Sequence, residues 1–215
     1  MPFFVVRVWL PDRPGALGAV ASRIGSVRAD VVGIEILERG AGRAVDELTI
    51  DLEDERHVDL LVKEIAQVDG VDVEHVRPAR GVLGDRAVMS LDVAAKISQT
   101  TTTAEALEHL AAGVHELFGA DWTAVTERGN GPALVACEGT DIPPVEWMAA
   151  FIAGAGSRSG SAAVDDLTSA TLLDTPYDLV LARSDLPLRD VERSILERLA
   201  ALAAAHIDSL NEHGR

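Results

Sequence analysis

The chain begins with a stretch, FFVVRVWL (residues 3–10), whose residues divide into two alternating sets, as in a β-strand. From residue 16 to residue 27, apolar residues recur at steps of three and four, which predicts an amphipathic helix. The segment LPDRPG between them predicts a tight turn. The second strand face, which carries Trp9, is unusually apolar. Either a partner or a second domain covers it, or its apolar residues are merely scattered on the surface.

The alternation typical of strands and the three- and four-residue spacing typical of helices continue to residue 80. The segments DVVGIEILER and RAVDELTIDLE read as strands and are joined by GAG, which predicts an antiparallel hairpin. A helical stripe from Val58 to Val68 follows, and GVDVEHVRP supplies a fourth strand. The order βαββαβ is the ferredoxin-like pattern, in which two helices cover one face of a four-stranded sheet. The uncovered edge and face favour pairing with another copy.

A second domain is predicted after this pattern. Residues 81–103 predict a linker helix and a turn, and residues 104–215 the second domain. Its pattern predicts a helix, a hairpin, a short helix, two further strands and a terminal helix over residues 188–210. The segment GAGSRSGS predicts a flexible, turn-rich loop before the two further strands.

Charge and cysteine content narrow the functional classes. The formal net charge is −16 and no basic patch stands out, so binding to nucleic acid or to an anionic membrane is disfavoured. The single cysteine, Cys137, excludes an internal disulfide and fits a reducing compartment. We find no signal peptide and no apolar run that would span a bilayer, and we expect a cytoplasmic protein.

Motifs for catalysis or metal binding are not found in the sequence. The histidines are scattered without zinc-like spacing, and there is no G-x-S-x-G, P-loop or dinucleotide fingerprint. Cys137 is predicted to be a buried, inert thiol, and the pairing of His109 with Glu116 fits a solvated helix face. We therefore expect no catalytic residues, no metal and no cofactor. The rival hypothesis is an enzyme that acts through residues 122–184.

The first domain resembles the ACT domain family. The resemblance rests on LPDRPGALGAVASRI and on ADVVGIEILERGAGRAVDELTIDL, and it covers residues 3–78. It implies a non-catalytic regulatory module, usually dimeric, that binds a free amino acid or a similar small molecule between two copies. YDLVLARSDLPLRDVERSILERLAALA, within residues 104–210, is similar to the end of GAF domains. The expected fold is α+β, a ferredoxin-like ACT domain over residues 1–80 followed by an α/β GAF-like domain.

The turn that precedes the first helix is the candidate binding site. Pro14 fixes its own φ and disfavours helix at Arg13, while Gly15 has access to conformations closed to other residues. The helix then starts with free N–H groups that suit a small carboxylate. We therefore predict ligand contacts from Asp12, Arg13, Pro14, Gly15, Ala16 and Leu17.

The ACT resemblance implies a second set of contacts from the neighbouring copy. It predicts Asp30, Val31, Val32 and Gly33, at the start of the second strand, to face the neighbour's turn. Asp12 or Asp30 would accept the ligand's ammonium group. Structural alternatives remain for both: Asp12 as a helix cap, and Asp30 as a residue that merely ends a loop. Arg13 is expected in solvent, and Gly18 is expected to serve close packing.

These features together predict a cytoplasmic, non-catalytic regulatory protein. It would form a homodimer, bind an amino acid at the ACT interface and signal to a separate effector protein. The alternatives are a dimerisation scaffold without a ligand, and ligand sensing mainly by the GAF-like domain.

Overall fold

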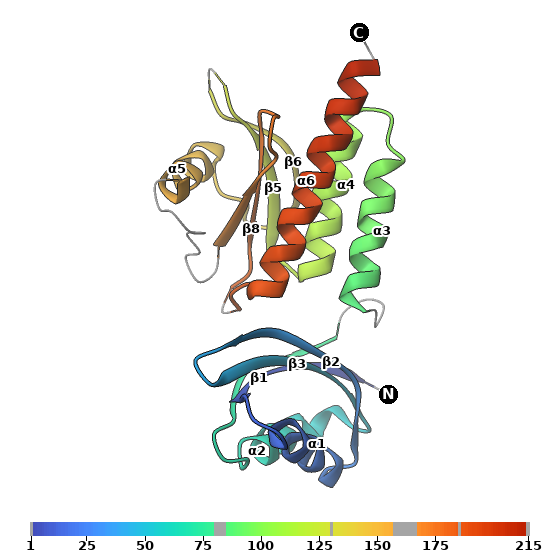
Figure 1. Ribbon diagram of the computed structural model, residues 1–215, viewed down its shortest axis with the longest axis vertical. Helices are drawn as coiled ribbons and strands as arrows, with labels where there is room; N and C mark the ends of the chain where they lie inside the picture. The colour runs from blue at the N-terminus through green and yellow to red at the C-terminus, as the bar shows by residue number, and fades with distance from the viewer. Residues whose placement is uncertain (1, 80–84, 130, 157–166, 185, 214–215) are drawn as a thin grey trace. The chain divides into compact units, whose positions relative to one another are not determined.

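The computed structural model describes residues 2–79, 85–129, 131–156, 167–184 and 186–213. Two compact units are present: residues 1–83 with 189–191, and residues 84–188 with 192–215. The ribbon in Figure 1 shows the helices and strands of each unit. The loop predicted at GAGSRSGS lies mostly outside the described residues.

The first unit contains four strands and two α-helices in the predicted order. Its elements are β1 (Phe3–Pro11), α1 (Ala16–Ser26), β2 (Ala29–Gly40), β3 (Arg43–Leu52), a short 3-10 helix (Glu55–His57), α2 (Val58–Ile65) and β4 (Asp72–Pro78). The strands form an antiparallel sheet in the order β2-β3-β1-β4, so β2 and β4 are edge strands. This arrangement confirms the ferredoxin-like prediction.

The core of this unit lies between the sheet and its two helices. One side-chain set of β1 packs against α1 and α2, which lie on one face of the sheet (Figure 1). The fully buried core residues include Val6 and Val8 of β1, Ile24 of α1 and Leu61 of α2. The apolar alternation of β1 therefore fixes which face the helices cover.

The opposite face of β1 is partly polar. Arg7 donates from Nε and Nη2 to the Glu47 carboxylate on β3, at 3.2 and 2.8 Å. The Trp9 indole N–H donates to Glu74 Oε1 on β4 at 3.0 Å, and the Arg43 guanidinium lies 5.4 Å from the Trp9 ring centroid. Within this unit, Trp9 thus has a hydrogen-bond partner and a cation–π contact.

The second unit is built on another antiparallel sheet. Its elements are α3 (Arg86–Ser98), α4 (Thr103–Phe118), β5 (Trp122–Glu127), β6 (Ala133–Gly139), α5 (Val145–Gly156), β7 (Leu167–Thr171), β8 (Tyr177–Ala182) and α6 (Asp190–His213). The strand order is β6-β5-β8-β7. In Figure 1, α3, α4 and α6 lie on one side of this sheet and α5 lies on the other. Both sheets are antiparallel, which confirms an α+β fold.

Helix α3, which falls within the segment predicted as a linker, packs inside the second unit. Its Val93 and Ile97 are buried in the cluster formed by α4, α6 and the sheet. A Cβ at Gly113 of α4 would lie only 2.5 Å from Cγ1 of Val93. The absence of a side chain at Gly113 therefore allows the two helices to approach closely.

The prediction of a buried Cys137 is wrong. Cys137 is exposed on β6, an edge strand of which only Ala136 is buried. An apolar strand sequence at the edge of a sheet does not require that its side chains be covered. No helix in the described segments is both long and apolar enough to cross a membrane.

Candidate functional site

The turn between β1 and α1 is fixed by backbone hydrogen bonds. The Asp12 N–H donates to the Gly42 carbonyl at 2.9 Å, which ties the turn to the β2–β3 hairpin. The Arg13 N–H donates to the Pro11 carbonyl at 2.8 Å. Gly15 has φ +89°, in the left-handed region, where an L-residue is strained. The sequence prediction that Gly15 serves the geometry of this turn agrees with this conformation.

Helix α1 begins directly after Gly15 and presents its N-terminus at the turn. The Ala16 N–H donates to the Arg13 carbonyl at 3.3 Å, and the Ala19 N–H donates to the Gly15 carbonyl at 3.0 Å. The N–H groups of Leu17 and Gly18 belong to the same turn and point out of the same end of the helix. They are the natural donors for a carboxylate at this position.

The side chains of the turn are open to solvent. Asp12, Arg13 and Pro14 are exposed, whereas Ala16 is buried and Leu17 is half-buried against the core. The N-cap residue is Gly15, and no side chain caps the helix. The alternative that Asp12 is the helix cap is therefore wrong.

Gly18 does not serve close packing, contrary to expectation. It is exposed, and a Cβ added there would meet no atom within 4 Å. The space beside Gly18, in the first turn of α1, is thus open.

The residues predicted on β2 lie far from the turn of the same copy. Pro11 pairs with Arg43 at one end of β3, whereas Asp30 pairs with Asp51 at the other end. From Arg43 to Asp51 the strand extends about 26 Å. One copy of the chain therefore does not bring the turn and Asp30 together.

Register also fixes the side on which each β2 residue lies. Val31 pairs with Ile50 on the helix-covered face, so the exposed Asp30, one position earlier, lies on the opposite face. Val32 falls at an irregularity of the ladder and is 51% exposed, and Gly33 pairs with Thr49. Asp30 is thus exposed, but not on the face that carries α1.

A carboxylate that the sequence interpretation overlooked lies on that face. Asp46 of β3 pairs with Val8 of β1 and with Ile36 of β2, and it is only 3% exposed. Burial raises the pKa of the Asp46 carboxyl; the Arg39 charge lowers it, and the Asp12 charge raises it further. Within the described residues, its Oδ1 has no hydrogen-bond partner.

A signal for Asp46 was present in the sequence. In RAVDELTIDL every second residue from position 44 to position 52, apart from Asp46, is a buried core residue: Ala44, Leu48, Ile50 and Leu52. Asp46 is the polar member of this apolar set. A charged residue at a core position of a strand is a candidate for function, because an unpaired buried charge is costly.

Strand β2 is an exposed edge with apolar side chains. Val32, Ile34 and Ile36 are 51%, 50% and 38% exposed. Ile34 and Ile36 pair with Leu48 and Asp46 and therefore lie on the same sheet side as α1. An edge strand with apolar side chains is a surface on which another strand can add.

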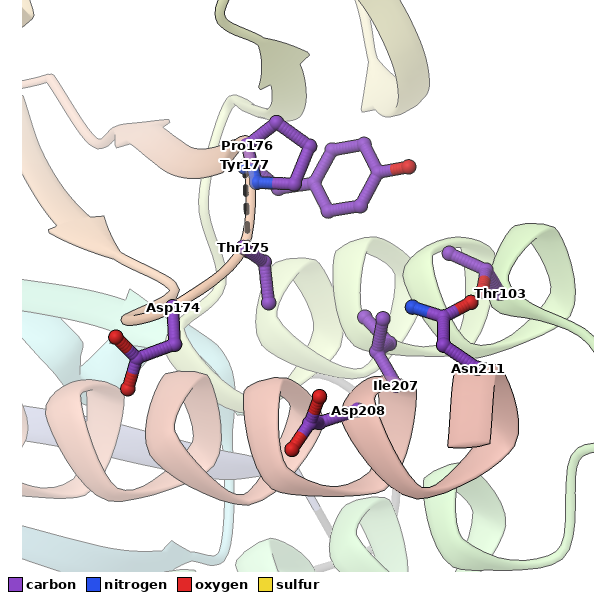
Figure 2. A pocket seen from close by; sticks show the side chains of 8 residues that line it. All are labelled: Thr103, Asp174, Thr175, Pro176, Tyr177, Ile207, Asp208 and Asn211. Atoms are coloured by element: carbon purple, nitrogen blue, oxygen red, sulfur yellow. Dashed lines mark hydrogen bonds between the residues drawn. The ribbon is translucent and has the colours of Figure 1, made fainter. Parts of the chain in front are cut away.

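The second unit has a cleft between the β7–β8 turn and helix α6, with a volume of about 220 Å³. Figure 2 shows Thr175 on the turn, Tyr177 at the start of β8, and Asp208 and Asn211 on α6. The Thr175 hydroxyl accepts a hydrogen bond from the Tyr177 N–H at 3.2 Å. Burial, together with the Glu127 charge, raises the pKa of the Tyr177 phenol.

Comparison with solved structures finds partial similarities to both parts of the chain. A GAF domain of a phosphoenolpyruvate-protein phosphotransferase from Coxiella burnetii is 11% identical, with a TM-score of 0.47, and covers 60% of this chain and 96% of its own. A methyl-accepting chemotaxis protein is 14% identical, with a TM-score of 0.47, covering 56% of this chain and 97% of its own. The ACT domain of a GTP pyrophosphokinase from Chlorobium tepidum is 16% identical, with a TM-score of 0.30, covering 37% of this chain and all of its own.

A comparison with curated proteins finds no match. The model of the ACT domain family matches residues 4–70, which run from β1 to the residues just before β4. The match includes the turn, α1, β2 and β3. Residues 4–70 thus form an ACT domain.

Proposed function

We propose that the chain is a non-catalytic regulatory protein that binds an amino acid between two copies of its ACT domain. The observation that carries this proposal is the start of α1, where a left-handed Gly15 opens a helix with no side-chain cap. Backbone N–H groups and the positive end of the helix dipole favour a carboxylate there. The ACT domain over residues 4–70 supports a small-molecule ligand and a dimer.

The second copy enters through β2. Antiparallel pairing of two β2 strands about a two-fold axis would set the Asp30 end of one strand beside residues 38–40 of the other. The turn is bonded to Gly42, at that same end of the sheet. Such a dimer would therefore bring the start of one β2 to the neighbour's turn, and one copy alone cannot do so.

Apolar side chains on β2 favour this pairing. Val32, Ile34 and Ile36 are exposed in the single chain. Burial between two copies would remove their apolar surface from water, which stabilises association by roughly 25 cal/mol per Å². Signal output would then require a separate effector protein that senses the liganded dimer.

Two alternatives remain for the ligand. The chain could be a dimerisation scaffold with an empty turn, or it could sense its ligand in the second unit. The cleft at Tyr177 favours the latter as a second candidate, because it gathers hydroxyl, carboxylate and amide groups around Ile207.

A thermal-unfolding screen of the full chain with the twenty common amino acids tests the proposal. A ligand at 100-fold excess over its Kd stabilises the folded state by about 2.7 kcal/mol. Gly15→Val forces a β-branched residue into the left-handed region and should abolish the shift. Gly25→Val, near the far end of α1 with no atom within 4 Å of the added Cβ, is the matched control and should retain it. No shift with any amino acid would favour the scaffold, and a shift that survives in a folded Gly15→Val variant would place the site elsewhere.

A further inference from the structure

Asp46 is a buried carboxylate on the helix-covered face of β3, and among the described residues its Oδ1 has no hydrogen-bond partner. Most buried polar atoms in proteins have a hydrogen-bond partner, so an exception requires an explanation. Arg39 acts on the Asp46 charge but is itself exposed, and no ion pair between the two occurs in the described residues. Oδ1 of Asp46 is therefore able to accept a hydrogen bond from a group outside the chain.

The position of Asp46 connects it to the turn. It pairs with Val8, two positions before Leu10 on β1, and Leu10 directly precedes the turn. Pro11, at the start of the turn, pairs with Arg43, which is three residues before Asp46, so about 10 Å of strand separates Asp46 from the turn. Asp46 is also on the face of the sheet that carries α1. The open end of the helix and Asp46 therefore lie on the same face and toward the same end of the sheet.

The two groups have opposite ligand preferences. The start of α1 favours an anion, and the Asp46 carboxylate favours a cation. Asp12 is exposed, where water and salt weaken its attraction for a cation. Asp30 lies at the other end of the sheet and on its other face.

We propose that Asp46 accepts the ammonium group of the ligand while the N-terminus of α1 holds its carboxylate. This inference rests on the proposed function and narrows it, because it requires a ligand with a free ammonium group. It replaces Asp12 and Asp30 as the ammonium acceptor. It leaves Val31, Val32 and Gly33 of the neighbouring copy to complete the site and enclose the ligand. A neutral amide or an N-acylated amino acid would leave one of the two groups unmatched.

Equilibrium binding of the full chain to three matched probes tests this assignment. For each of the twenty common amino acids, the probes are the free amino acid, its N-acetyl derivative without the ammonium, and its amide without the carboxylate. Loss of a charged hydrogen bond weakens binding by about 10- to 100-fold. We expect that loss for N-acetyl derivatives in the wild type, and for the free amino acid in Asp46→Asn. Asp59→Asn, an exposed carboxylate on α2 outside the sheet, is the matched control and should bind as the wild type does.

The outcomes separate the two proposals. If the free amino acid and its N-acetyl derivative bind equally, or if Asp46→Asn retains full affinity, the assignment of Asp46 is overturned while amino-acid binding stands. If only amides bind, and Asp46→Asn abolishes that binding, Asp46 is supported and the carboxylate site is overturned. If no probe binds the wild type, both proposals are overturned.

Discussion

Asp46 lies on the core-facing side of β3, between the buried apolar residues Ala44 and Leu48. Its burial has a cost for the ionised form, since no hydrogen bond to Oδ1 offsets the lost water within the described residues. The ionised Asp46 thus lowers the stability of the unliganded protein, while it supplies a group that can bind the ligand. Stability and ligand binding should therefore respond in opposite directions to the same substitution.

Asp46→Asn should raise the free energy of unfolding of the unliganded protein at neutral pH by roughly 1 kcal/mol or more. The pKa of Asp46 in the folded state is raised above its ordinary value of 3.8. As the pH rises above about 3.8, the Asp46 carboxyl loses its proton in the unfolded chain before it does so in the folded protein. The free energy of unfolding therefore falls until the carboxyl of the folded protein ionises as well. The advantage of the Asn variant should therefore grow with pH and then level off.

Urea unfolding at several pH values between about 4 and 7 measures this difference, with the exposed Asp59→Asn as the reference. An Asn variant that is less stable than the wild type at every pH would mean that the Asp46 carboxylate already has a stabilising partner within the chain.

Single residues also mark what the sequence could predict. The turn at Gly15 could be predicted from local chemistry, because Pro14 restricts its own φ and Gly15 can adopt a left-handed conformation that strains other residues. Gly18 could not be interpreted in the same way, since open space and close packing both accept glycine. Cys137 was misplaced because an apolar strand sequence does not say whether the strand lies at the edge of its sheet.

Among the elements, α3 shows the limit of a helical period. The pattern predicted the helix but not its neighbour, because an apolar stripe does not identify the surface that covers it. Val93 and Ile97 pack in the second unit. The contact that locates α3 is the one between Val93 and Gly113, which are distant in sequence.

Gly113→Ala should therefore destabilise the second unit by about 1–3 kcal/mol, because its Cβ would lie 2.5 Å from the stiff side chain of Val93. Gly154→Ala on α5, with open space around it, is the control and should gain up to about 1 kcal/mol from helix propensity. Denaturant unfolding measures both.

Adding Val93→Ala to Gly113→Ala removes the overlap. The double variant should then be no less stable than Val93→Ala alone. A Gly113→Ala protein as stable as the Gly154→Ala control would contradict the close packing of α3 on α4.

The β2 edge is the element on which the proposed dimer depends. Ile34→Lys should shift the chain from dimer to monomer, because a charge would replace a half-exposed apolar residue in the shared strand pair. Leu60→Lys on α2, at a site 45% exposed, is the matched control and should leave the dimer intact. Light scattering after size-exclusion chromatography gives the mass. A wild-type monomer, or a dimer that persists in Ile34→Lys, would mean that β2 is not the interface.

At the scale of the whole molecule, the chain joins an ACT domain to a second four-stranded unit. Periodicity and turn chemistry were enough to predict the order of strands and helices in both. They could not show that the predicted site residues fall into two separate groups, because the turn and Asp30 lie at opposite ends of one sheet. A site divided between two copies is a property of the assembly, and its parts are not neighbours in any single chain.

The central claim is that the amino-acid site exists only in the dimer. Titration calorimetry of Ile34→Lys against Leu60→Lys, with the amino acid that stabilises the wild type, tests this claim most directly. The account predicts wild-type affinity for Leu60→Lys and at least a tenfold weaker Kd for Ile34→Lys. A monomeric Ile34→Lys protein that binds the amino acid with full affinity would contradict it.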